Sequence, residues 1–370
     1  MAEELVQDAL VEALECWPTD GIPHDPRAWL HTVARRRAID RLRRDITYRR
    51  KLSELETLSF SEEDNRLELI FLCCHPALAP EAQVALTLRA VCGLTTAEIA
   101  SAFIVPEPTL AQRIVRARRK IVEAGIAYRL PDAEELDKRL AGVLATLYLL
   151  FNEGYLSSEE GAAERRDLAE EATWLAELLV RLFPGEPEPL GLLALMRLHL
   201  ARVHARFDAA GDLVLLPKQD RSTWDRSKIA ESVALLERAA RFRRPGVYQL
   251  QAAIAACHAE AASWETTDWP QILVLYDMLQ TIAPSPVVRL NRAIALRQIA
   301  GPALALEDIN QLATTLDKYH LFHATRAHLL RELGRSKEAR AAEQRALSLT
   351  RNPAERSLLR SRLNNDWCGC

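Results

Sequence analysis

Two short segments concentrate the side chains with the most distinctive chemistry, which is the binding of anions. Between Arg27 and Lys51 there are ten Lys or Arg and two Asp, a local net charge of +8. A second cluster lies further along the chain and comprises Arg113, Arg116, Arg118, Arg119 and Lys120. The whole chain has a formal net charge of −3, so its positive charge is segregated. Such clusters are typical of nucleic-acid-binding proteins, and a solvated charged face is the alternative.

The first basic segment is preceded by an acidic helix. Over residues 1–16, leucines recur on one side of the predicted helix, while Glu4, Asp8 and Glu12 form an i, i+4, i+8 stripe on another. Four residues, Pro18, Gly21, Pro23 and Pro26, break this helix and predict a stiff loop over 16–26. The next helix begins near Pro26, with Trp29 on its apolar side and arginines on the other.

The second basic segment lies in a predicted helix-turn-helix. After a polar linker at 53–65, Pro80 opens a helix, Gly93 ends it, and Thr95 or Thr96 caps another. A break at 104–106 separates this short helix from a basic amphipathic one. Its inward side is predicted to carry Leu110, Ile114, Val115 and Ile121. Its outward side is predicted to carry Gln112, Arg113, Arg116, Arg119 and Lys120, as in a helix that enters the major groove.

Beyond Pro131 the pattern is of helical hairpins. Residues 290–296 align with 324–330 at a shift of 34 residues, and Gly301 and Gly334 recur at nearly the same offset. This is the period of a tetratricopeptide repeat (TPR). Residues 250–256 resemble an earlier degenerate copy, and 354–363 a capping helix.

Composition agrees with an all-α protein of two or three units. The chain has 370 residues, only 13 glycines and no segment of alternating β-branched residues. No apolar run is long enough for a membrane span and the start is not a signal sequence, so we expect a cytoplasmic protein. The seven cysteines lack a framework spacing, and Cys73-Cys74-His75 lacks the paired spacing of a zinc site. We expect no metal, no cofactor and no catalytic constellation.

In their order, these features resemble the sigma-70 family, specifically extracytoplasmic-function sigma factors with a C-terminal TPR-like domain. Residues 2–9 look like the core-binding helix of sigma region 2, residues 27–44 like its promoter-melting helix, and residues 94–121 like the helix-turn-helix of region 4. Three later segments, 149–155, 189–196 and 219–225, look like the extension of that subgroup.

The resemblance implies a domain order and a fold. We expect region 2 at 1–52, a linker at 53–65, region 4 at 66–128 and a TPR-like domain at 132–370. The fold class is therefore all-α, with sigma region 2 helices, the region 4 helix-turn-helix and C-terminal helical repeats. Family members have a further helix before the position where this chain begins, so region 2 is expected to be N-terminally incomplete.

The resemblance also assigns roles to residues. The β′ coiled coil of RNA polymerase core would contact Glu4, Gln7, Asp8 and Glu12, and the β flap would be a second contact of the chain with core. The −10 region of the promoter would contact Trp29, Arg35, Arg36, Arg37, Arg41 and Arg44, although the place of Trp29 on the apolar side of its helix favours a core role over base contact. The −35 region would contact Thr109, Gln112, Arg113, Arg116, Arg119 and Lys120, with Gln and the first two Arg suited to base edges. Regulation through the extension, with a possible partner protein, would involve Asp220, Arg221 and Trp224.

One turn departs from the family pattern. Ile104 occupies a position where many such proteins carry glycine, and a β-branched residue resists positive φ. We therefore expect this turn to follow another backbone path. Two rival functions stay open at this point, a TPR scaffold with a DNA-binding helix-turn-helix and an enzyme built on the C-terminal domain.

Overall fold

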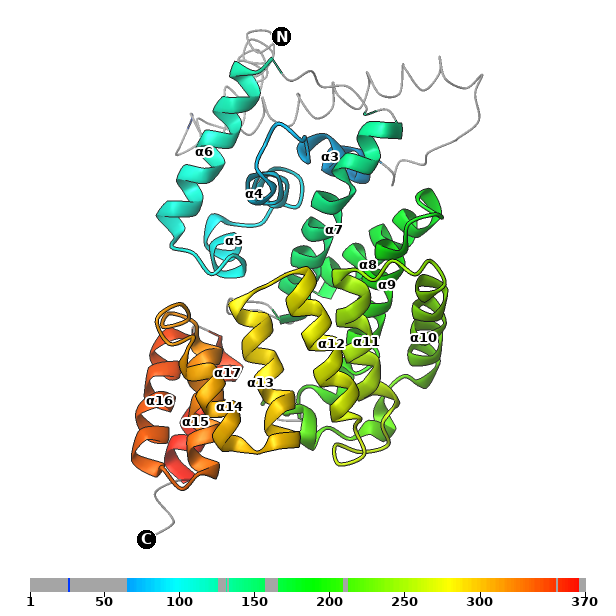
Figure 1. Ribbon diagram of the computed structural model, residues 1–370. Coiled ribbons are helices and arrows are strands. Elements are labelled where there is room, and N and C mark those ends of the chain that lie inside the picture. Colours follow the sequence, from blue (N-terminus) through cyan, green and yellow to red (C-terminus); the bar gives the residue numbers. More distant parts are fainter. Residues whose placement is uncertain are drawn as a thin grey trace, which may run out of the picture. The chain divides into compact units, whose positions relative to one another are not determined.

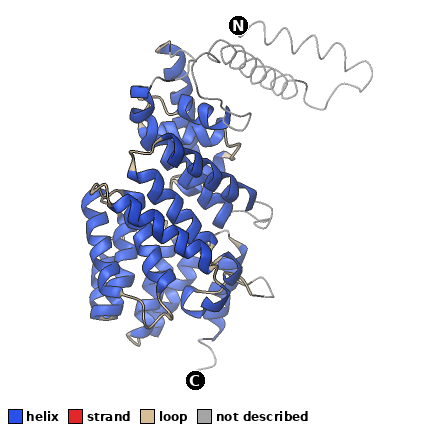
Figure 2. Cartoon of the chain, turned by 90° about the vertical axis from the view of Figure 1, so that its right-hand side faces the viewer, coloured by secondary structure: helices blue, strands red, loops and turns tan. Residues whose placement is uncertain are grey.

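The computed structural model describes residues 26, 65–125, 131, 133–156, 166–208, 212–350 and 352–365. In these residues the only β feature is an isolated bridge between Phe207 and Leu213, and every regular element is a helix (Figures 1 and 2). The all-α prediction is confirmed. The chain divides into two compact units, Met1–Leu69 and Ile70–Cys370, and the first is described only at Pro26 and at residues 65–69.

The predicted helix-turn-helix is formed by short helices whose ends follow the sequence signals. The helices are α3 (Asn65–Cys73), α4 (Pro80–Ala90), α5 (Thr96–Ala102) and α6 (Glu107–Glu123). Proline is the first residue of α4, and Gly93 (φ +77°) follows its end. Thr95 begins α5 with a capping box, in which its hydroxyl accepts from Glu98 N–H at 3.2 Å and its own N–H donates to the Glu98 carboxylate at 2.5 Å.

The turn between α5 and α6 does not follow the path predicted for it. Ile104 has φ +54°, so it adopts the left-handed conformation that we expected it to avoid. Ile104 N–H donates to Ser101 O and Val105 N–H to Ala100 O, both at 3.0 Å, which is the Schellman arrangement. Gly334 ends a later helix with the same pair of bonds at φ +72°. The hydrogen bonds of the turn thus outweigh the steric cost of a β-branched residue.

This strained isoleucine gives a prediction for stability. Ile104→Gly should raise the free energy of unfolding by about 0.5–1 kcal/mol, because glycine adopts positive φ without a Cβ clash. Little packing is lost, since the Ile104 side chain is 44% exposed. Urea denaturation followed by circular dichroism measures the change. Ile104→Ala is the control, because it removes the same side chain and keeps the Cβ, and a gain equal to that of glycine would contradict the explanation.

Eleven further helices follow in the described residues, and each packs against its neighbour in the series. They are α7 (Ala133–Leu156), α8 (Arg166–Leu182), α9 (Pro187–Leu200), α10 (Arg226–Ala240), α11 (Val247–Glu260), α12 (Trp269–Ile282), α13 (Pro286–Ala300), α14 (Pro302–Asn310), α15 (His320–Glu332) and α16 (Ser336–Leu349), and α17 (Pro353–Asn365) ends the series. Between α9 and α10 the chain makes three short 3-10 helices, η3 (Val203–Ala205), η4 (Leu216–Lys218) and η5 (Arg221–Thr223).

The two segments that align at a 34-residue shift occupy equivalent places in successive hairpins. They form parts of α13 and α15, and Ala293 and Ala327 are both fully buried. Gly301 and Gly334 follow these helices with positive φ. Helix α9 also contacts α11, which is two helices further along the chain. Near the start of the series, α9 therefore packs against both α10 and α11.

The first helix of this series also packs against the helix-turn-helix unit. Helices α4 and α5 both contact α7. Phe71 stacks on Phe183 of the α8–α9 turn with ring centroids 5.9 Å apart. Arg139 of α7 is 3% exposed and its Nη1 donates to Phe71 O at 3.1 Å. Thus the helix-turn-helix and the C-terminal helices share one packed junction.

Candidate nucleic-acid interface

The second basic cluster lies on α6. The buried face of this helix determines which of its side chains point outward. Leu110, Ile114 and Ala117 are the buried residues of this helix. The helix carries five basic and two acidic residues. The outward face therefore has a net positive charge, which suits it to bind phosphate.

The structure exposes nearly all of the side chains predicted to contact the −35 region. The exposed residues are Thr109, Gln112, Arg116, Arg119 and Lys120. The helices that follow do not cover these residues, although they belong to the same compact unit. In this arrangement the C-terminal helices leave the recognition face of α6 accessible.

Arg113 differs from its neighbours because it is partly buried. Its guanidinium carbon lies 5.7 Å from the centroid of the Phe103 ring, at the turn before α6. A cation–π contact of this kind attracts the guanidinium to the ring and so restricts the Arg113 side chain. Phe103 was not among the predicted site residues, and its position one residue before Ile104 was the only signal in the sequence.

Two other arginines have local partners. Arg116 Nε donates to Gln112 O, one turn earlier, at 3.3 Å. Arg119 Nε lies 3.4 Å from Glu123 Oε1 in an exposed i, i+4 pair. Such exposed pairs contribute little to stability, so Arg119 can exchange this partner for a phosphate.

One residue of the predicted inward face is misplaced. Val115 is 64% exposed and was predicted to be buried. With 100° per residue, Val115 lies about 140° from Leu110, so it cannot share the buried stripe of Leu110 and Ile114. An exposed valine beside Gln112 is suited to contact a thymine methyl group.

The ten residues predicted to contact core polymerase and the −10 region lie outside the described residues. They are Glu4, Gln7, Asp8, Glu12, Trp29, Arg35, Arg36, Arg37, Arg41 and Arg44. Their roles stay predictions.

The three residues predicted to be regulatory form a corner after η4. Asp220 Oδ1 accepts from Ser222 N–H at 2.9 Å and from the Ser222 hydroxyl at 2.7 Å, and these bonds lower the pKa of the Asp220 carboxyl. Arg221 Nη1 donates to His258 O at 2.5 Å and to Ala261 O at 2.8 Å. Its guanidinium carbon lies 4.9 Å from the centroid of the Trp224 ring.

These contacts identify the corner as a clamp on α11. The carbonyl groups of His258 and Ala261 lie at the C-terminal end of that helix, where helical hydrogen bonds run out. Arg221 is 7% exposed and Trp224 is 3% exposed, so the clamp is buried. Asp220 and Arg221 thus have structural partners rather than the geometry of an acid–base pair.

The fold and the site of the described residues are those of a helix-turn-helix DNA-binding protein with a helical C-terminal extension. Models of protein families match three parts of the chain, sigma-70 region 2 over residues 1–46, sigma-70 region 4 over 68–121, and a family of unknown function, DUF6596, over 139–240. An uncharacterized protein of Rhizobium meliloti is 44% identical over 380 aligned residues, covering 99% of this chain and 90% of the relative. No solved structure matches the chain.

The chain belongs to the sigma-70 family. Its two matched regions support the role of a sigma factor in promoter-directed transcription initiation, with RNA polymerase core and promoter DNA as partners. No helix among the described residues combines the length and apolarity needed to cross a membrane.

Proposed function

We propose that this protein is an extracytoplasmic-function sigma factor that works in the cytoplasm, is not an enzyme and is regulated in cis by its TPR-like C-terminal domain. The observation that carries the proposal is the exposed basic face of α6. This helix has the buried stripe of a recognition helix and follows the capped helix α5 after a tight turn. In this proposal Gln112, Arg113 and Arg116 read base edges of the −35 region, and Arg119 and Lys120 contact phosphates.

The proposal for regulation is supported by the junction between α4 and α7. Since Arg139, Phe71 and Phe183 link the two parts directly, a change in the C-terminal helices would reach the helix-turn-helix through packed side chains. The recognition face is exposed, so the proposed control acts on the position or rigidity of region 4 rather than by covering it. A partner protein bound by the C-terminal domain would use the same route.

The test is in vitro transcription of genomic DNA fragments with purified core polymerase, followed by mapping of the transcript 5′ ends. We expect start sites that need both core and this chain, or a version extended upstream at the N-terminus. If Arg116 makes a bidentate base contact, Arg116→Ala should weaken binding to the −35 region of these promoters by about 1–3 kcal/mol. Initiation at these sites should fall accordingly. Arg119→Ala should weaken binding to all DNA sequences alike and make the binding affinity depend less on salt concentration.

Arg116 is a cleaner choice than Arg113, because replacing Arg113 also removes its contact with Phe103. Arg335→Gln is the control, since that arginine is exposed and pairs with Glu338 in the first turn of α16. If core is active with another sigma factor yet neither version of this chain gives specific start sites, the proposal is wrong. A TPR scaffold and an enzyme built on the C-terminal domain would then remain as candidate functions.

A further inference from the structure

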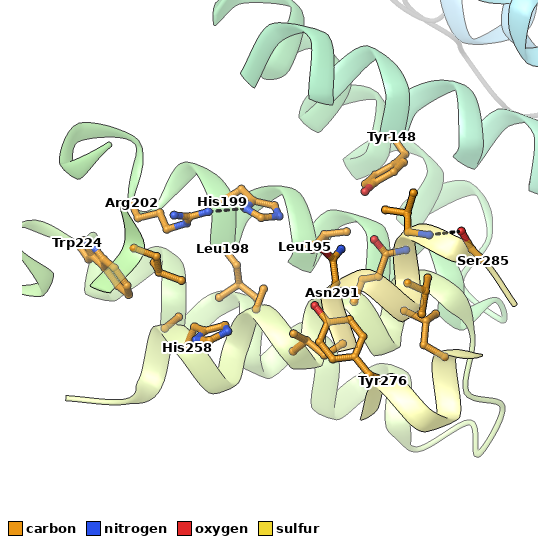
Figure 3. Close-up of a pocket in the computed structure, with 18 residues that line it drawn as sticks. Tyr148, Leu195, Leu198, His199, Arg202, Trp224, His258, Tyr276, Ser285 and Asn291 are labelled. Carbon is orange, nitrogen blue, oxygen red and sulfur yellow. Dashed lines mark hydrogen bonds between the residues drawn. The ribbon is translucent and has the colours of Figure 1, made fainter. Parts of the chain in front are cut away.

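A cavity of about 440 Å³ lies inside the C-terminal helices. Figure 3 shows side chains from four helices converging on it, with Tyr148 from α7, His199 from α9, His258 from α11 and Tyr276 from α12. Leu216 of η4 and Trp224 after η5 add a wall from the loop between α9 and α10. This volume falls within the range of small-molecule sites, about 300–1,000 Å³.

The charged and polar groups of the cavity favour an anion. Among the described residues, Arg202 lines it and no Asp or Glu does. The hydrogen-bond partners of the Arg202 guanidinium are neutral, with Gln219 Oε1 at 3.4 Å and His199 Nδ1 at 3.5 Å. Burial and nearby arginines lower the pKa of His199 to about 3 and that of His258 to about 4, so both imidazoles are neutral at pH 7.

A buried donor without a partner lies at the same end of the cavity. Trp224 is 3% exposed, and its Nε1 has no hydrogen-bond partner within the described residues. The Asp225 N–H donates to Ala201 O at 2.8 Å, which joins the chain beside Trp224 to the chain beside Arg202. This Nε1 has almost no accessible surface, so it does not face the cavity, and the Trp224 ring forms part of the wall beside Arg202.

The geometry of this end is fixed before any ligand arrives. Arg221 packs against the Trp224 ring and donates to carbonyls of α11, while His258 stacks on Trp264 with centroids 5.9 Å apart. Such preorganisation lowers the entropic cost of binding. Aliphatic side chains from Leu195, Leu198, Ile254, Leu279 and Val287 form much of the remaining wall, and Gln251, Ser285 and Asn291 add neutral polar groups.

We propose that this cavity binds a small organic carboxylate with an apolar body. The carboxylate would accept from the Arg202 guanidinium beside the Trp224 ring, and the apolar body would lie against the leucine, isoleucine and valine side chains of α9, α11, α12 and α13. Arg is suited to this task because its planar guanidinium can donate two bonds to one carboxylate. Binding itself does not depend on sigma activity, whereas any effect on transcription rests on the proposed function.

The test is isothermal titration calorimetry of the full chain with two acids, 4-phenylbutyrate and octanoate, and with the amide of each. We expect at least one acid to bind, and its amide to bind at least tenfold more weakly. Arg202→Gln should weaken the acid about tenfold or more and change the amide little. Ala255→Trp, which fills the cavity, should abolish binding of both, and thermal unfolding checks that each variant is folded.

Arg335→Gln serves as the matched control, because it removes an exposed arginine outside the cavity and should bind like the wild type. The proposal is overturned if neither acid binds at millimolar concentration, if acid and amide bind equally, or if Arg202→Gln binds the acid as tightly as the wild type. Transcription with and without the bound acid is a separate readout. Binding without any effect on transcription would support the site and contradict ligand control of the sigma activity.

Discussion

Replacing Arg139 by Met is expected to lower the free energy of unfolding of the 70–370 unit by about 3 kcal/mol. The Arg139 guanidinium is buried between the two parts of the unit, donates to Phe71 O and lies 3.7 Å from Glu135 Oε2. Methionine has a similar volume but no donor, so the Phe71 carbonyl at the end of α3 would lose a charged partner. Breaking a buried ionic hydrogen bond by removing one side is costly because the other group stays buried.

Urea denaturation of the full chain measures this loss, and Lys138→Met is the matched control. Lys138 precedes Arg139 on the same helix and is exposed, so its replacement should change stability by less than about 0.5 kcal/mol. Equal effects of the two variants would show that the junction does not form in solution. The same pair of variants, compared at matched folded concentration in transcription, tests whether the junction carries regulation.

This junction also affects how regulation by the C-terminal helices can be tested, because removing these helices would disrupt the junction. A chain that ends after Tyr128 would lose α7 and expose the faces of α4 and α5 that pack against it. Gly142 of α7 marks how close the packing is, since a Cβ there would lie 2.6 Å from Gln83 Oε1. The truncated chain could lose activity because its exposed apolar faces aggregate. Substitution at Arg139 is therefore a better test of regulation than a stop codon after Tyr128.

Gly191→Ala is expected to destabilise the C-terminal helices by about 3 kcal/mol, although alanine is the better helix former. A Cβ at Gly191 of α9 would lie 2.5 Å from Gln249 N and 2.8 Å from Gln249 Cα of α11. Both atoms are backbone, so the two helices must separate and give up packing along their contact. Helix propensity returns only about 1 kcal/mol, and overpacking against a rigid neighbour exceeds that gain.

The matched control for this prediction is Gly185→Ala. Gly185 precedes the same helix, and a Cβ there would meet no atom within 4 Å. We expect its midpoint in urea to stay close to that of the wild type, while that of Gly191→Ala falls. A neutral or stabilising effect of Gly191→Ala would mean that α9 and α11 do not approach this closely in solution.

Several features of the fold followed from the residues alone because they depend on neighbours in sequence. Pro80, Gly93 and Thr95 act within one turn of their own helix ends, so the boundaries of α4 and α5 could be predicted. Similarly, the stripe of Leu110 and Ile114 identified the buried face of α6. The errors at Ile104 and Val115 have different causes. Hydrogen bonds of the turn overrode a side-chain preference at Ile104, and the assumed stripe on α6 was too wide at Val115.

What the sequence by itself determined was the class of fold, the two basic clusters and the helix that presents the second one, since charge and periodicity are local properties. Only the tertiary structure decided which buried polar groups meet. Arg139 lies 68 residues from its acceptor Phe71, and its place between Leu136 and Leu140 was the only hint that it is buried. The cavity joins Arg202 and Trp224 to His258 and Tyr276 through the packing of α9, α11 and α12, which no local pattern encodes. Contacts of this kind depend on how helices cross, and the crossing is set by the summed packing of many side chains.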